Sequence, residues 1–130
     1  METGLQVAVS IQCSVFGVAH LLRPGVLIQF YGVLASKGEA GVVFIALLSL
    51  LSGSVIVAFH NVWTGLPIVL TLVGWSQLLK GTSYLLFPSL GLRFISRVTP
   101  DRQNAFRLPG IPLLVVAALL AWHVIENSGN

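Results

Sequence analysis

Four apolar runs, each about as long as a membrane-spanning helix, most constrain what this chain can fold into. A helix of roughly 20 apolar residues crosses the hydrocarbon core of a bilayer. Only 8% of the 130 residues are charged, whereas about 25% are charged in a typical soluble domain. Because water would solvate such a chain poorly, the bilayer is the expected solvent. The sequence therefore predicts an all-α polytopic membrane protein, a bundle of four transmembrane helices.

The predicted organisation is a single membrane domain over residues 1–130. The spans cover residues 4–22, 40–59, 66–87 and 109–125, and residues 89–108 form a basic interfacial segment on the cytoplasmic side. Residues 26–37 are apolar but too short to cross, so they either lie along the interface or continue a tilted first helix. Ser36-Lys37-Gly38-Glu39 has the form of a capping box, which would begin the second span.

Small and polar residues recur at helical spacing in three of the predicted spans. Such faces allow helices to approach closely in a bilayer and give polar side chains a partner. We therefore expect them to point into the bundle. The faces are Gln6, Ser10, Cys13, Gly17 and His20 in the first span; Glu39, Ala46, Ser49, Gly53 and His60 in the second; and Thr71, Gly74, Leu78 and Gly81 in the third.

The basic residues of the predicted loops lie on one side of the bundle. Arg23 and Lys37 follow the first span, and the third loop contains Arg93, Arg97, Arg102 and Arg107. Loops that face the cytoplasm carry the excess of Lys and Arg, so both termini should lie outside the cytoplasm. We expect the four arginines to contact anionic lipid. Nucleic acid is not an expected partner, because no aromatic stacking platform accompanies them.

The stretch over residues 60–88 resembles a known class of protein. The resemblance is carried by HNVW at residues 60–63, Gly74-Trp75, Lys80-Gly81 and YLLFP at residues 84–88. These features are similar to those of uncharacterised small bacterial integral membrane proteins with four predicted helices. The resemblance implies a bacterial inner membrane location and supplies neither an activity nor a catalytic residue.

Familiar catalytic motifs are missing from the sequence. It contains no phosphate-binding glycine loop, HExxH or GxSxG. We therefore assign no catalytic residue and favour a non-enzymatic protein without a cofactor. The leading hypothesis is a small scaffold or accessory subunit, which packs in a homo-oligomer or against a larger membrane complex through its small-residue faces.

The ionisable residues of the predicted spans support two alternative hypotheses. Ionisable side chains inside a membrane are functional candidates, so Lys80 could form a small-molecule, quinone or ion site with His20 and Glu39. Lys80 could instead extend its ammonium toward the cytoplasmic head groups. The other alternative is a haem b or a metal ligated by His60 and His123, which end their helices on the outer side.

Overall fold

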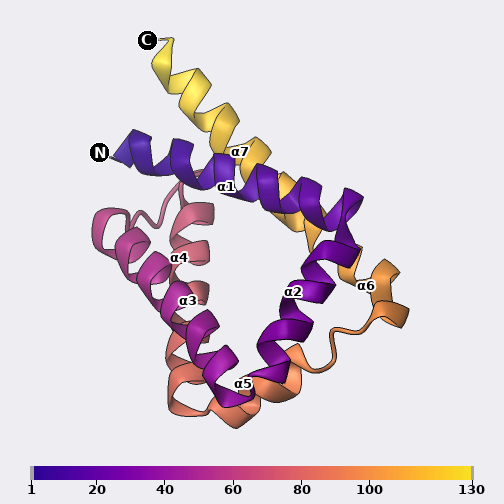
Figure 1. Cartoon of the computed structure of the whole chain (residues 1–130). Helices are drawn as coiled ribbons and strands as arrows, with labels where there is room; N and C mark the ends of the chain where they lie inside the picture. The colour runs from indigo at the N-terminus through magenta and orange to yellow at the C-terminus, as the bar shows by residue number, and fades with distance from the viewer. Residues whose placement is uncertain (1, 130) are drawn as a thin grey trace.

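The computed structural model describes residues 2–129, which contain no strand and are helical apart from short connections. The predicted all-α class is therefore confirmed for this range (Figure 1). Its seven α-helices and one 3-10 helix are α1 (Glu2–Leu22), α2 (Pro24–Ser36), α3 (Glu39–Phe59), α4 (Ile68–Leu86), α5 (Pro88–Ile95), η1 (Pro100–Arg102), α6 (Gln103–Arg107) and α7 (Gly110–Ser128).

Three segments are long and apolar enough to cross a membrane, which is consistent with a membrane protein. They are Glu2–Leu22, Glu39–Phe59 and Pro100–Ser128. Helix α4, which occupies the predicted third span, is not among them, because Gln77, Lys80 and several hydroxyl side chains interrupt its apolar sequence. The structure thus confirms helices suited to a membrane but does not confirm the predicted bundle of four spans.

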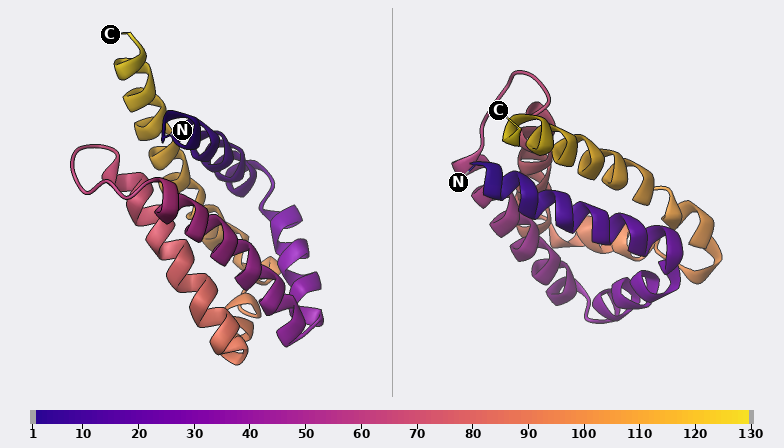
Figure 2. Two further views of the ribbon diagram at one scale, coloured as in Figure 1. Left: turned by 90° about the vertical axis from the view of Figure 1, so that its left-hand side faces the viewer. Right: turned by 90° about the horizontal axis from the view of Figure 1, so that it is seen from above.

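The long helices pack as two antiparallel pairs, α1 with α7 and α3 with α4 (Figures 1 and 2). Glycines make both contacts close. A Cβ added at Gly81 would lie 2.6 Å from the backbone nitrogen of Leu50, and one added at Gly110 would lie 2.8 Å from the carbonyl oxygen of Gly17. Most of the predicted small-residue faces are buried in these contacts, which confirms their inward orientation. Glu39, at the start of α3, is an exception because it is exposed.

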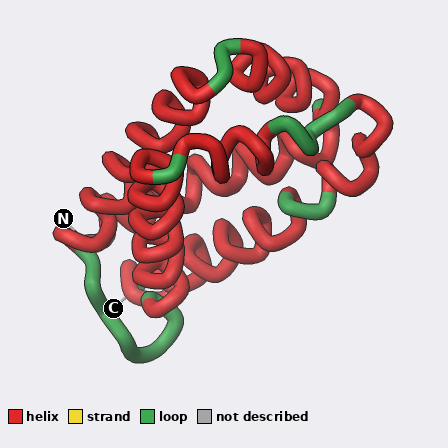
Figure 3. Tube along the Cα trace, turned by 90° about the horizontal axis from the view of Figure 1, so that it is seen from below, coloured by secondary structure: helices red, strands yellow, loops and turns green. Residues whose placement is uncertain are grey.

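Buried apolar side chains form two clusters, of which the first holds the two helix pairs together. The first joins all four long helices and includes Val9, Ile56, Leu70 and Leu120. The second, around Val42, joins α2, α3 and α5 at the opposite end of the molecule. The start of α1, the end of α7 and the connection over residues 60–67 lie at the end nearer the first cluster (Figures 2 and 3).

The connection between α2 and α3 differs from the sequence prediction. Arg23-Pro24 separates α2 from α1, so residues 26–37 do not continue the first helix. Helix α2 extends to Ser36, whose hydroxyl donates to the Val33 carbonyl at 2.6 Å instead of capping α3. Gly38 precedes α3 with φ 64°, a left-handed conformation that glycine adopts at little cost. The predicted capping box was therefore wrong, since its serine is still part of the preceding helix.

Candidate functional site

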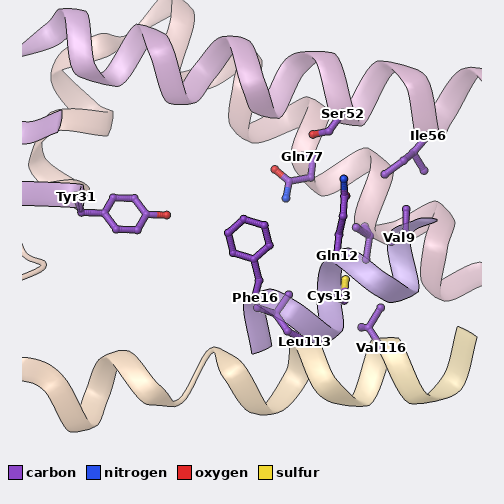
Figure 4. Close-up of a pocket in the computed structure, with 11 residues that line it drawn as sticks. Val9, Gln12, Cys13, Phe16, Tyr31, Ser52, Ile56, Gln77, Leu113 and Val116 are labelled. Carbon is purple, nitrogen blue, oxygen red and sulfur yellow. The ribbon is translucent and has the colours of Figure 1, made fainter. Parts of the chain in front are cut away.

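A cavity of about 290 Å³ lies between the two helix pairs, near the middle of α1 and α4 (Figure 4). Five helices contribute to its wall, which is mostly apolar and carries no charged side chain. The cavity forms because the two helix pairs contact each other at the first apolar cluster, while α2 covers the side of the cavity opposite that cluster. The polar groups of its wall are Gln12, Tyr31, Ser52 and Gln77.

These polar side chains point toward the same space from different helices. In Figure 4, Gln12, Ser52 and Gln77 lie on one side of the cavity, and the Tyr31 hydroxyl points inward from the other side. The Ser52 hydroxyl donates to the Ser49 carbonyl at 3.1 Å. No hydrogen bond within residues 2–129 involves the side chains of Gln12, Tyr31 or Gln77. Their hydrogen-bonding groups are therefore available to a bound molecule.

An aromatic cluster fixes the position of Tyr31. The Tyr31 ring packs edge-on against Phe106, with 5.8 Å between centroids, and the other neighbour of Phe106 is the His20 ring at 4.8 Å. His20 Nδ1 donates to the Phe106 carbonyl at 3.0 Å. Burial raises the pKa of the Tyr31 hydroxyl, so this group is neutral and can both donate and accept a hydrogen bond.

Cys13 also lines the cavity, next to Gln12. It is the single cysteine of the sequence and is a buried free thiol. Because the thiol lies in the cavity wall, the rate of its alkylation reports how accessible the cavity is.

The structure does not bring together the site predicted around Lys80. The Lys80 ammonium lies 5.8 Å from the centroid of the Tyr84 ring, and Lys80 does not line the cavity. His20 is bound to Phe106, and Glu39 is exposed. Within residues 2–129 no ion pair joins Lys80 to Glu39, and a function for this lysine stays a prediction.

His60 and His123, the candidate ligands of a haem or a metal, both lie against α1. They contact residues in two successive turns of that helix. His60 is only 2% exposed, and its Nε2 donates to the Pro67 carbonyl at 3.0 Å. His60 Nδ1 lies 3.1 Å from Glu2 Oε1, although the two atoms are not aligned for a hydrogen bond.

His123 Nδ1 donates to Oε1 of Gln6 at 3.1 Å, so it too engages a side chain of α1. Residues 2–129 hold no group of three or more metal-ligating side chains. Ligation of haem b or of a metal therefore stays a prediction.

The residues of the cavity were missed in the sequence because they lie on separate helices. A local signal did exist for two of them, since Gln12 and Gln77 interrupt apolar runs near their middle.

The four arginines expected to contact anionic lipid, Arg93, Arg97, Arg102 and Arg107, are all exposed.

No protein-family model, curated protein or solved structure matches the chain, so similarity assigns it neither a family nor an activity.

Proposed function

We propose that this protein binds a small, uncharged molecule of the membrane in the cavity between its helix pairs. The observation that carries the proposal is the convergence of Gln12, Tyr31 and Gln77, whose side chains have no hydrogen-bond partner among residues 2–129, on a mostly apolar space. An unpaired polar group in an apolar surrounding is costly, and mostly apolar cavities with a few convergent polar groups are typical ligand sites.

The cavity favours a ring or short chain that carries a carbonyl or hydroxyl group. Known pockets for small molecules occupy roughly 300–1,000 Å³, and a cavity of about 290 Å³ would accept a head group without a long tail. Amide and phenol groups can donate to a carbonyl, and the absence of charge in the wall favours a neutral ligand. The ring of a quinone, with its tail in the bilayer, has this chemistry. Gln12 is exposed at the cavity wall, which supports entry from the side.

The scaffold hypothesis depended on the small-residue faces, and those faces pack within the chain. A Cβ at Gly74 would lie 2.5 Å from the Ile56 side chain, and Gly53 and Gly81 contact the opposite backbone in the same way. The pattern therefore accounts for folding of one chain without requiring a partner. Oligomerisation or a role as an accessory subunit stays a prediction.

We also infer that α4 crosses the membrane beside α3, and that both termini lie outside the cytoplasm of a bacterial inner membrane. The close backbone contact of α3 with α4 supports a shared membrane segment. The grouping of the start of α1, the end of α7 and residues 60–67 at one end supports the orientation, since α5 and α6, which contain arginines of the predicted third loop, lie away from that end (Figures 1 and 2).

Alkylation of Cys13 tests the binding proposal with the full chain in detergent. We expect a benzoquinone with a short alkyl tail and methyl groups at its other ring positions, which leave no free ring carbon to add the thiol, to slow the reaction of Cys13 with N-ethylmaleimide, because the thiol lines the same cavity. Intact mass measures the reaction and also shows that the quinone itself forms no adduct. The protection should saturate with quinone concentration. The corresponding alkylbenzene, which lacks the carbonyls, should protect much less.

Four variants separate binding from a general effect on the bundle. Gln12→Leu and Gln77→Leu should remove the difference between the quinone and the alkylbenzene, because each takes a polar group from the wall. Gln29→Leu is the matched control, since Gln29 is exposed on α2 and does not line the cavity. Unchanged quinone protection in the double variant Gln12→Leu/Gln77→Leu would contradict the proposal.

A further inference from the structure

The basic segment forms a second hollow, separate from the cavity. Arg97, which follows α5, and Arg102, which ends η1, line a pocket of about 170 Å³. The apolar side chains of Val98, Ala105 and Phe106 complete most of its wall. The pocket thus combines two guanidinium groups with an apolar floor, whereas the sequence alone showed four arginines without grouping them.

Arg97 also connects this pocket to a neighbouring hollow. That hollow is lined by Arg93 and Arg97 together with Leu92 and two serines, Ser89 and Ser96. Since Arg97 belongs to both, the two hollows are adjacent. Three guanidinium groups and three hydroxyl groups, including that of Thr99, therefore line the two adjoining hollows, and all of them carry hydrogen-bond donors.

The guanidinium groups that line these hollows are not engaged by carboxylates. No ion pair within residues 2–129 involves Arg93, Arg97 or Arg102. Asp101 is the acid closest to them in sequence and is exposed; hydrogen bonding by Thr99 and, to a smaller extent, the charge of Arg102 lower the pKa of its carboxyl, but within the described range it forms no ion pair with Arg93, Arg97 or Arg102. The Arg97 guanidinium lies 5.6 Å from the centroid of the Phe94 ring, which leaves its N–H groups free to bind an anion.

We propose that Arg97 and Arg102 bind the phosphate of an anionic phospholipid, with Arg93, Ser89 and Ser96 beside its head group. Arginine is suited to phosphate because its planar fork of donors matches two phosphate oxygens. The apolar floor favours a lipid over a free phosphate, which would gain nothing from Val98 or Phe106. Leu90 and Phe94, which are exposed on α5, provide apolar surface next to the arginines for the acyl chains. The proposal of this lipid site does not depend on which ligand, if any, binds in the cavity.

Lipid retention measured by native mass spectrometry tests the proposal with the full chain. The protein is reconstituted in nanodiscs of phosphatidylcholine with a minor fraction of phosphatidylglycerol, and the bound lipids are counted after release. We expect the double variant Arg97→Gln/Arg102→Gln to retain phosphatidylglycerol about tenfold less well, a change of roughly 1.4 kcal/mol in binding. The control Arg23→Gln/Lys37→Gln removes the same charge from residues that line neither hollow.

The outcomes distinguish a specific lipid-binding site from a nonspecific electrostatic attraction between basic residues and anionic lipid. Equal loss in the two double variants, or no loss in either, would overturn the proposal. Arg97→Lys/Arg102→Lys keeps the charge but not the fork, and we expect it to fold and to retain phosphatidylglycerol less well than the native chain. Full retention in this variant would also overturn the proposed recognition of phosphate by arginine. Displacement of the lipid by millimolar inorganic phosphate would show that free phosphate is the ligand and would overturn the lipid assignment, whereas no displacement supports it.

Discussion

The closeness of α3 to α4 predicts that the same substitution will stabilise the protein less at Gly81 than at Gly32, a helical glycine with open space around it. In Gly81→Ala, the new methyl group would meet the Leu50 backbone nitrogen at 2.6 Å and its Cα at 2.8 Å, whereas ordinary contacts begin at 3.4 Å. Because backbone atoms cannot rotate away, the helices would have to separate by roughly 0.8 Å, a gap that removes a quarter to a half of the dispersion energy of the facing atoms. Gly32→Ala is the control, since nothing lies within 4 Å of its added Cβ.

The difference between the two variants isolates the cost of this contact. Both substitutions gain about 1 kcal/mol of helix propensity, and overpacking costs Gly81→Ala about 1–3 kcal/mol. Gly32→Ala should therefore raise the free energy of unfolding, and Gly81→Ala should fall below it by about 1–3 kcal/mol. Reversible unfolding in mixed micelles with increasing dodecyl sulfate, followed by tryptophan fluorescence, measures both values. Equal stability of the two variants would refute a backbone contact at Gly81.

Two further predictions concern the connection after α3 and the topology. The Thr71 hydroxyl donates to the Val62 carbonyl at 2.7 Å and accepts from the Val62 N–H at 3.0 Å. Thr71→Val should therefore lower the free energy of unfolding by about 1–3 kcal/mol in the same assay, while Thr71→Ser, which keeps the hydroxyl, loses less; equal losses would contradict this role. In a Cys13→Ala background, Ser128→Cys should react with a membrane-impermeant maleimide in intact cells and Ser96→Cys only after permeabilisation, and the reverse pattern would overturn the orientation.

Features that depend on one helix at a time were predictable from this sequence. The spacing of Gly53, Gly74 and Gly81 places each on the face that packs, because helical periodicity is a local property. The capping box failed for a related reason. Its pattern describes the start of α3 but contains no information on where α2 ends, and α2 includes Ser36. The prediction of α4 as a span depended on an apolar run of sufficient length, and Gln77 and Lys80 make that helix less apolar than its partner α3.

The cavity could not be predicted, because it depends on how one helix pair is placed against the other. No spacing rule relates Gln12 to Gln77, which lie on different pairs, or either of them to Tyr31, whose position depends on Phe106 far along the chain. The same holds for Arg97 and Arg102, whose pocket requires the turn between α5 and η1. Sequence patterns thus identified the residues that build each pair, and the candidate sites lie where separate elements meet.

Packing within the pairs and packing between them have different consequences for binding. Glycines bring α1 to α7 and α3 to α4 at backbone distance, so a ligand that had to separate either pair would break many contacts at once. Between the pairs, contact is provided by the side chains around Leu70 and Leu120, and beyond this cluster Gln12 and Gln77 face the cavity. A molecule that enters there can replace weak contacts and satisfy free polar groups without disturbing either pair. This difference in packing makes the space between the pairs the place in the fold where binding would cost least.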